Sequence, residues 1–199
     1  MKRIGIFGGT FNPPHIGHSI IADDVREQMH LDKILFIPSG VHPLKEASPD
    51  MASAKQRYEM AKLAFGNDKN FEVSDIEIKN TSEKSYTVDT LIKLKELYKK
   101  DFVNLYLILS TDNLIEFPKW KNPEKLFLLS EVICVNRPGY YINEVKSEYS
   151  QRVKYLNVLN LEISSTIIRE HIRFKKSIKY LVHPEVENYI YKNKIYQNV

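Results

Sequence analysis

The stretch that most constrains the fold is residues 4–18, Ile-Gly-Ile-Phe-Gly-Gly-Thr-Phe-Asn-Pro-Pro-His-Ile-Gly-His. A short apolar run leads into a segment rich in Gly and Pro, and a helical pattern begins near Gly17 and His18. This order predicts a strand, a loop and a helix start. A helix N-terminus presents free N–H groups and a positive dipole end, and both favour an anion. Because four of the seven glycines lie between Gly5 and Gly17, we expect this loop to cradle nucleotide phosphates.

Two histidines, His15 and His18, stand three residues apart at the predicted helix entrance, so both rings can face one bound group. Neutral imidazole donates one hydrogen bond, and imidazolium adds a positive charge that a nearby phosphate favours. A zinc site and two unrelated surface histidines are the alternatives. Zinc would need a third ligand nearby, but Cys134 lies in an apolar run and no Cys or His cluster follows. The spacing therefore favours a phosphate site.

Strand and helix patterns alternate along the rest of the chain. Residues 18–30 have helical spacing and 33–38 form a continuous apolar run, so that with the first strand they predict a right-handed βαβ unit and a parallel sheet. Further strands are predicted at 71–78, 104–109, 132–135 and 158–161. Further helices are predicted at 53–66, at 87–98 and from residues 122, 165 and 183. Ligands of such α/β sheets bind beyond the carboxyl ends of the strands, where the Gly-rich loop would lie.

Two further segments could contact a ligand. The irregular loop 38–52 is long enough to suggest a function, and its Lys45 is the candidate for a phosphate contact, with a solvent-exposed lysine as the alternative. Thr87 is the predicted N-cap of the helix at 87–98. That helix end offers donors and no acceptors, so it would prefer a carboxylate to a carboxamide. A plain surface cap is the alternative there.

Asp112 and Trp120 follow the most hydrophobic predicted strand, 104–109. Asp112 at that strand end could hold a ribose hydroxyl or cap the next helix. Trp120, the only tryptophan, stands between Lys119 and Lys121. Charged neighbours suggest a ring exposed on one face that could stack on a planar heterocycle, although a core position is the alternative.

A second phosphate site is predicted near the C-terminus. Ser164, Ser165 and Thr166 stand at a helix start and Arg169 follows one turn later. Hydroxyls, free N–H groups and a guanidinium suit phosphate binding. The hydroxyls could simply cap the helix, but three in succession exceed what one cap requires. Two such sites, roughly 150 residues apart in the chain, would fit one extended triphosphate.

Composition limits the class of protein. At 199 residues with one cysteine and a net charge of +4, we expect a single domain, 1–199, whose C-terminal helical part, about 164–199, packs on it. There is no apolar run of 18 residues, and Lys2 and Arg3 precede the first strand directly, so we expect no membrane span, no signal peptide and a cytoplasmic location. Binding of RNA through Lys175, Lys176 and Lys179 is an alternative, but basic and acidic residues are interleaved and we expect no nucleic-acid partner.

Several of these segments match known motifs. Residues 8–18 resemble the His-x-Gly-His signature of the nucleotidylyltransferase superfamily, and 163–169 resemble its second signature. Residues 85–91, 118–120 and 136–139 resemble the bacterial nicotinate mononucleotide adenylyltransferases. Together the motifs span nearly the whole chain. The resemblance implies an α/β fold, with a Rossmann-like, doubly wound and mainly parallel sheet covered by helices on both faces. In that family ATP and nicotinate mononucleotide give nicotinate adenine dinucleotide and pyrophosphate, for NAD biosynthesis.

The resemblance also implies roles for individual residues. His15 and His18 would bind the triphosphate and stabilise the transition state. The ATP and phosphate site would comprise Gly8, Gly9, Thr10, Phe11, Asp112, Ser164, Ser165, Thr166 and Arg169. The nicotinate mononucleotide site would comprise Lys45, Tyr86, Thr87 and Trp120. Mg²⁺ would accompany ATP, held mainly by the substrate phosphates, with no metal site built from the protein.

Other acceptors are open alternatives. Enzymes that share the first signature also use nicotinamide mononucleotide, pantetheine phosphate or the acceptors of cytidylyl transferases. Trp120 and the Tyr86-Thr87 pair argue against pantetheine phosphate and against the cytidylyl acceptors. A nucleotide-binding protein without catalysis is a further alternative. The sequence leaves the oligomeric state, including a homo-oligomer, open.

Overall fold

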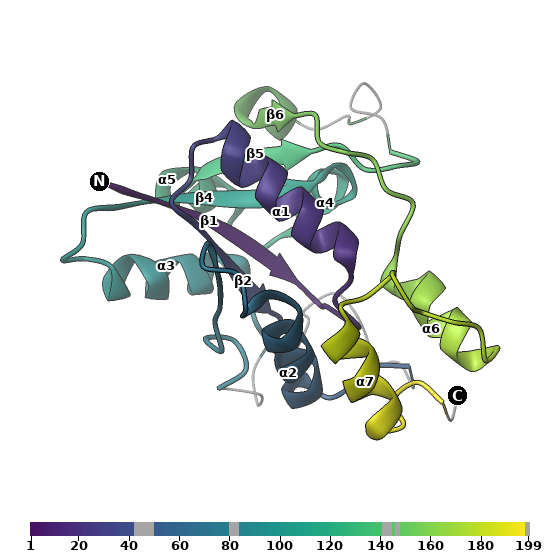
Figure 1. Ribbon diagram of the computed structural model, residues 1–199. Coiled ribbons are helices and arrows are strands. Elements are labelled where there is room, and N and C mark those ends of the chain that lie inside the picture. The colour runs from purple at the N-terminus through teal and green to yellow at the C-terminus, as the bar shows by residue number, and fades with distance from the viewer. Residues whose placement is uncertain (42–49, 80–83, 141–144, 146–147, 198–199) are drawn as a thin grey trace.

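The computed structural model describes residues 1–41, 50–79, 84–140, 145 and 148–197. Within them a six-stranded sheet has the order β3-β2-β1-β4-β5-β6, and each neighbouring pair is parallel (Figure 1). The strands are β1 (Lys2–Gly9), β2 (Lys33–Pro38), β3 (Phe71–Val73), β4 (Val103–Ser110), β5 (Glu131–Val135) and β6 (Lys154–Leu156). This arrangement confirms the predicted parallel α/β fold.

Helices cover both faces of the sheet. They are α1 (Ile16–Gln28), α2 (Ala54–Phe65), α3 (Thr87–Leu97), α4 (Thr111–Glu116), α5 (Pro123–Leu129), α6 (Ser165–Arg173) and α7 (Pro184–Lys192), with short 3-10 turns η1 (Phe117–Lys119) and η3 (Glu148–Arg152). Side chains of α1 and α2 pack in one cluster with one face of the sheet, and those of α3, α4 and α5 pack in a second cluster on the other face. The sheet is therefore doubly wound.

Successive side chains of each central strand point into the two hydrophobic clusters on opposite faces of the sheet. In β4, Leu105, Leu107 and Leu109 point into the cluster with α3 and α5, while Tyr106 and Ile108 point into the cluster with α1. Successive side chains of a strand face opposite sides, so a strand covered on both faces must be continuously apolar. This accounts for the unbroken apolar runs in the sequence.

The strand order places a crevice at the carboxyl ends of two central strands. The chain winds outward in one direction from β1 through β2 to β3, and in the other from β4 to β6. β1 and β4 are hydrogen-bonded neighbours, so the winding reverses between them. Open α/β sheets bind their ligands where the winding reverses, outside the carboxyl ends of the strands. Gly9 ends β1 there and Ser110 ends β4.

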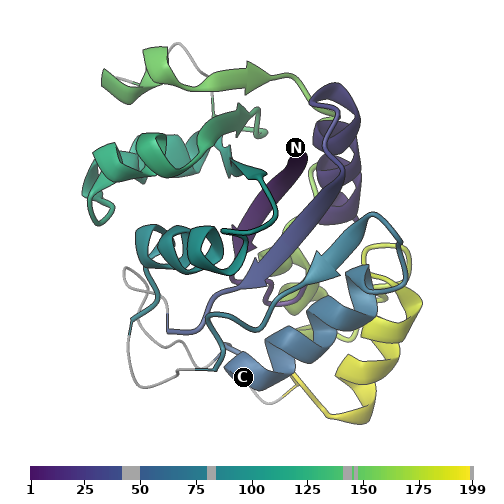
Figure 2. The same ribbon diagram turned by 90° about the vertical axis from the view of Figure 1, so that its left-hand side faces the viewer.

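The C-terminal segment adds a third cluster beside the sheet. Ile168, Ile172, Val186 and Ile190 of α6 and α7 are buried against Met60 of α2. Figure 2 shows α7 running beside α2, below the edge of the sheet that β3 forms. The segment that carries the second predicted phosphate site is thereby fixed to the sheet end that carries the first.

Two predicted strands differ from the structure. The strand predicted at 71–78 ends at Val73, because the Ser74 hydroxyl accepts from the N–H of Ile76 and starts a turn. The strand predicted at 158–161 is not a strand. There the Asn136 side chain bonds both the N–H and the carbonyl of Val158, which replaces a strand partner. The last strand, β6, lies at Lys154–Leu156 instead.

Within the described part of the chain, no helix has both the length and the apolar character that crossing a bilayer requires.

Candidate active site

The loop between β1 and α1 is shaped by tight packing beneath it. Phe11 is buried and has a positive φ of 48°. Its ring lies so close under Gly9 that a Cβ at that position would stand 3.0 Å from the ring. No atom lies within 4 Å of the place where Gly8 would carry a Cβ. Gly9 therefore allows the loop to close over Phe11, while the neighbouring backbone at Gly8 faces open space.

Asn12 holds the middle of this loop. Its side-chain amide donates to the carbonyl of Asp50 at 2.9 Å, and its Oδ1 accepts from the N–H of Ala52 at 3.0 Å. Oδ1 also accepts from the hydroxyl of Tyr196 at 2.8 Å. Asn12 thus joins the loop to two segments that are 38 or more residues away in the chain. Asn12 had no role predicted from the sequence, because a loop asparagine has no periodic pattern that reveals its partners.

Arg57 of α2 also holds the Gly-rich loop, and this role was not predicted from the sequence. Its guanidinium is buried and donates to the backbone carbonyls of Thr10 at 2.8 Å, Gly40 at 3.0 Å and Ala52 at 3.2 Å. Three carbonyls on three separate stretches of chain are thereby held around one planar group. The sequence did contain one indication of this role. Arg57 lies among the buried apolar residues of α2, and a buried charge needs hydrogen-bonding partners.

The two predicted catalytic histidines lie ring against ring. The imidazoles of His15 and His18 are stacked with centroids 3.6 Å apart, and the His18 ring meets Phe11 edge-on at 5.0 Å. α1 begins at Ile16 with His15 as its N-cap, slightly earlier than predicted. The N–H of His15 donates to Nδ1 of His18 at 3.1 Å. In neutral His18 the ring proton must therefore sit on Nε2, which becomes its donor to a ligand.

Burial keeps both rings neutral in the free protein. The pKa of His15 is lowered to about 4, mainly by burial and to a smaller extent by the nearby positive charge of Arg137. The pKa of His18 also lies well below its ordinary value, first because of burial and then because of the charges of His15 and Arg137. The imidazolium form considered from the sequence thus requires an anion close by. Without one, the rings offer neutral hydrogen-bond donors.

The C-terminal phosphate segment meets the N-terminal loop directly. Ser165 Oγ donates to the carbonyl of Pro13 at 2.8 Å, and the Arg169 guanidinium donates to the carbonyl of Asn12 at 2.9 Å. Arg169 also contacts the Thr166 hydroxyl at 3.3 Å, and the Ser164 hydroxyl caps α6 by accepting from the N–H of Ile167. Residues more than 150 positions apart therefore share one site.

Some of the polar groups in this site are occupied and others are not. The N–H of Ile16, at the start of α1, donates to the carbonyl of Leu181 at 3.0 Å, so it is not available to a ligand. By contrast, Nδ1 of His15 and Nε of Arg169 are buried and have no hydrogen-bond partner among the described residues. Buried polar atoms without partners are costly, and they mark places where a bound molecule would supply the missing bond.

Asp112 is already engaged by Arg137, the residue whose charge acts on both histidines. Its carboxylate accepts from Arg137 at 2.6 Å and from the hydroxyl of Ser110. The Thr111 side chain points away, donating to the carbonyl of Val135 at 3.0 Å. Asp112 therefore acts first as the partner of Arg137, and the proposed ribose contact must share or replace that ion pair.

Tyr86, Thr87 and the Trp120 segment come together at the start of α3. The N-cap of α3 is Tyr86 and not Thr87 as predicted, because Tyr86 has extended backbone and Thr87 is already helical. Lys121 Nζ lies 4.7 Å from the centroid of the Tyr86 ring and donates to Asp89 at 2.8 Å. The Trp120 ring is half-buried and leans on Phe117, with centroids 5.3 Å apart. The stacking role of the Trp120 ring stays a prediction.

Two other expectations concern Lys45 and a metal. Lys45 lies outside the described residues. Among those that are described, no group of three or more His, Cys, Asp or Glu side chains is placed to hold a metal ion. Cys134 is buried in β5, and burial raises the pKa of its thiol to about 12. The donor set around the loop consists of imidazoles, hydroxyls and guanidinium groups, which suits phosphate oxygens.

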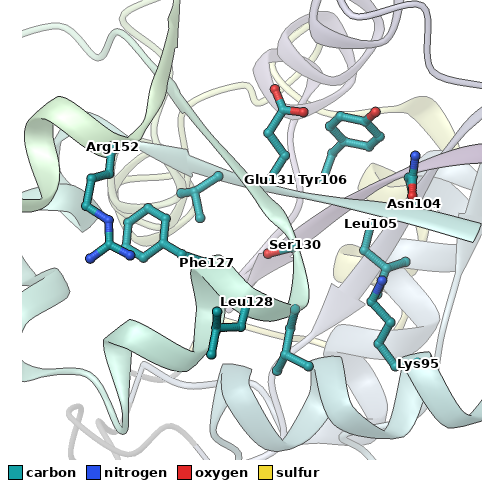
Figure 3. Close-up of a pocket in the computed structure, with 11 residues that line it drawn as sticks. Lys95, Asn104, Leu105, Tyr106, Phe127, Leu128, Ser130, Glu131 and Arg152 are labelled. Atoms are coloured by element: carbon teal, nitrogen blue, oxygen red, sulfur yellow. The ribbon is translucent and has the colours of Figure 1, made fainter.

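A separate cavity of about 470 Å³ opens at the amino ends of β4 and β5 (Figure 3). Asn104 and Glu131, near the amino ends of β4 and β5, line it together with Phe127 and Arg152. The Gly-rich loop leaves the carboxyl end of β1. The cavity and the loop therefore lie at opposite ends of the strands, and the cavity is not part of this site.

Comparison with known proteins agrees with this geometry. A family model described as cytidylyltransferase-like matches residues 6–171. A probable nicotinate-nucleotide adenylyltransferase of Caldicellulosiruptor saccharolyticus is 39% identical over 98% of this chain and 99% of its own. The nicotinate-nucleotide adenylyltransferase of Bacillus subtilis is 37% identical over the full length of both chains.

A solved structure gives the same fold. Plasmodium falciparum nicotinic acid mononucleotide adenylyltransferase, complexed with NaAD, has a TM-score of 0.78 and 23% identity over 98% of each chain. At that identity the likeness concerns the fold alone. The fold, the family model and the full-length relatives agree, and this chain belongs to the cytidylyltransferase-like family and, within it, to the nicotinate-nucleotide adenylyltransferases.

Proposed function

We propose that this protein transfers the adenylyl group of ATP to nicotinate mononucleotide, giving nicotinate adenine dinucleotide and pyrophosphate in NAD biosynthesis. The full-length relatives carry the name of this activity. The observation in the structure that supports it most is the meeting of the two phosphate segments, where Ser165 and Arg169 bond the loop that carries His15 and His18. One triphosphate can contact both segments only if they lie this close.

The reaction needs no nucleophile from the protein. A phosphate oxygen of the mononucleotide attacks the α-phosphorus of ATP, a new P–O bond forms, and the bond to the bridging oxygen of the β-phosphate breaks, so that its electron pair leaves with pyrophosphate. Catalysis then consists of alignment and of donors placed where negative charge grows. His15 and His18 supply imidazole donors to the triphosphate, and Arg169 supplies a positive charge. Gly8, Gly9, Thr10 and Phe11 form the backbone of the cradle.

The mononucleotide binds toward the start of α3. The helix end at Tyr86 and Thr87 presents donors to the nicotinate carboxylate, and the exposed side of the Trp120 ring stacks on the pyridine ring. Lys45, which lies outside the described residues, is assigned a phosphate contact as part of this proposal. A carboxamide would place its NH₂ group against donors, so nicotinate is favoured over nicotinamide.

The remaining parts of the proposal follow from the substrates. Mg²⁺ bound with ATP would be held mainly by the triphosphate and would supply charge neutralisation there. Asp112 contacts the ribose of the adenosine moiety. The chain 1–199 works as a single domain with residues from about 164 packed on it, and it acts in the cytoplasm.

The direct test is pyrophosphate release from ATP and Mg²⁺ with one acceptor at a time. Nicotinate mononucleotide should support turnover, nicotinamide mononucleotide should support less, and pantetheine phosphate none. Omitting the acceptor or adding EDTA should stop release. Faster release with pantetheine phosphate, or saturable binding of RNA without turnover, would reject the proposal in favour of one of those functions.

A further inference from the structure

Glu77 lies outside every motif discussed so far, yet it connects three segments near the proposed mononucleotide site. It follows β3, and its carboxylate accepts a hydrogen bond of 2.7 Å from the hydroxyl of Thr90 in the first turn of α3. Thr90 also contacts the carbonyl of Tyr86, the N-cap residue, at 3.3 Å. Glu77 is thereby linked through one hydroxyl to the start of the helix.

The same carboxylate reaches two more donors. Burial raises the pKa of Glu77, and hydrogen bonds from Thr90, from the backbone N–H of Gly40 and from the Ser85 hydroxyl act in the opposite direction. A carboxylate that accepts from three donors is a strong tether for all of them. These donors belong to α3, to the residues just after β2 and to the residue before the N-cap.

The backbone around Gly40 is packed too closely for any other residue. A Cβ on Gly40 would stand 2.3 Å from the carbonyl oxygen of Glu77 and 2.7 Å from Ser85 Oγ. The N–H of Ser85 donates to the carbonyl of Val41 at 2.9 Å, which joins the same two stretches again. A small cavity of about 60 Å³ lies against this junction, lined by Glu77, Ser85 and Tyr86 among others.

Hydrogen bonds also connect Gly40 to the Gly-rich loop between β1 and α1. The carbonyl of Gly40 accepts from the Arg57 guanidinium, which holds Thr10 of the Gly-rich loop through its carbonyl. A continuous set of hydrogen bonds therefore runs from Thr10 through Arg57 and Gly40 to Glu77 and the N-terminus of α3. Within this set of hydrogen bonds, Glu77 is the residue that links Gly40, just after the end of β2, to Thr90, at the start of α3.

We infer that Glu77 is a positioning residue that fixes the N-terminus of α3 against the end of β2, and so sets the site for the acceptor mononucleotide. The inference rests on the proposed function. Without its carboxylate, the donors of Gly40, Ser85 and Thr90 lose their common acceptor and the helix start shifts, while the ATP contacts on the loop and α6 remain.

The test is Glu77→Gln, which keeps the size and removes the charge. The KM for nicotinate mononucleotide should rise about tenfold, the scale of one charged hydrogen bond. The KM for ATP should stay within about twofold, because no ATP contact uses Glu77. The matched control is Glu72→Gln on β3, an exposed glutamate paired with Lys33, which should change neither constant.

Variants of Thr90 keep the inference testable if Glu77→Gln fails to fold. Thr90→Val should raise the same KM and Thr90→Ser should restore it, and the Val and Gln changes together should be less than additive. Equal rises in both KM values, or full additivity, would overturn the inference and leave a general structural role. A wild-type enzyme that releases no pyrophosphate with nicotinate mononucleotide would instead overturn the proposed function.

Discussion

The hydroxyl of Tyr196 donates to Oδ1 of Asn12 at 2.8 Å, across 184 residues of sequence. Tyr196 is buried, and burial raises the pKa of its phenol, with the charges of Arg169 and Arg57 acting in the opposite direction. The phenol therefore remains protonated and keeps donating at any ordinary pH. Together with the bond from Arg169 to the Asn12 carbonyl, it means that the far end of the chain holds the loop in its binding shape.

Tyr196→Phe should remove this one bond and keep the ring packing. We expect a loss of about 1 kcal/mol in the free energy of unfolding, the usual net value of a hydrogen bond. The KM for ATP should rise a few-fold because Asn12 loses one of its anchors. Urea unfolding and steady-state kinetics measure the two effects. Tyr180→Phe, at a residue that is 79% exposed, is the control and should behave like wild type.

His18→Ala should retain the fold and lose turnover by about a hundred- to a thousandfold, as expected for one preorganised donor to a developing charge. Pyrophosphate release at saturating substrates measures kcat, and circular dichroism checks the fold. His30→Asn is a suitable control because His30 is exposed and its positive φ of 49° suits asparagine. Near-normal turnover of His18→Ala would remove this residue from the mechanism.

The buried His15 should make the protein less stable in mild acid. Its folded-state pKa of about 4 lies below the ordinary value of 6.5, so between these pH values the unfolded chain binds a proton that the folded one does not. The stabilisation is complete above pH 6.5 and is lost as the pH falls toward 4.

The size of this effect follows from the two pKa values. Between pH 7 and pH 5 the loss due to His15 should be about 2 kcal/mol. His15→Asn keeps a good N-cap residue and removes the titration. Urea unfolding at both pH values should therefore show a smaller loss in the variant than in the wild type. Equal losses would mean that His15 titrates normally in the folded protein.

Arg57→Lys should damage both stability and binding although it keeps the charge. An ammonium group cannot reach three separate carbonyls in the geometry of a planar guanidinium, so carbonyls of Thr10, Gly40 or Ala52 would be left buried and unbonded. We expect a loss of about 2 to 3 kcal/mol in unfolding free energy and higher KM values for both substrates. Lys55→Ala, at an exposed position of the same helix, should leave both nearly unchanged.

The features that could be predicted from the sequence are those that depend on a local pattern of neighbouring residues. Apolar runs predicted β1, β2, β4 and β5, the Gly and Pro segment predicted the loop, and helical spacing predicted α2, whose start is capped by Ser53 with Gln56. The motifs at both ends of the chain identified the family, and the structure brings those two ends together.

The features that escaped prediction are single side chains whose partners come from distant segments. Asn12, Arg57 and Glu77 each bind backbone or hydroxyl groups on other stretches of chain, and no periodicity encodes such contacts. The strand predicted at 158–161 failed for the same reason, since one asparagine side chain supplies what a neighbouring strand would have supplied. Arg137 belonged to a recognised motif, but its effect on the two histidines depends on proximity that only the fold creates.

The bonds from Ser165 and Arg169 to the first loop have a consequence for the newly made chain. During synthesis on a ribosome the Gly-rich segment emerges more than 150 residues before Ser165 and Arg169, which anchor it. A nascent or prematurely terminated polypeptide that stops before residue 164 could form much of the sheet, yet its nucleotide loop would lack the contacts that give it shape. The contacts that shape the nucleotide loop would therefore form only after residues 165 to 169 have been synthesised.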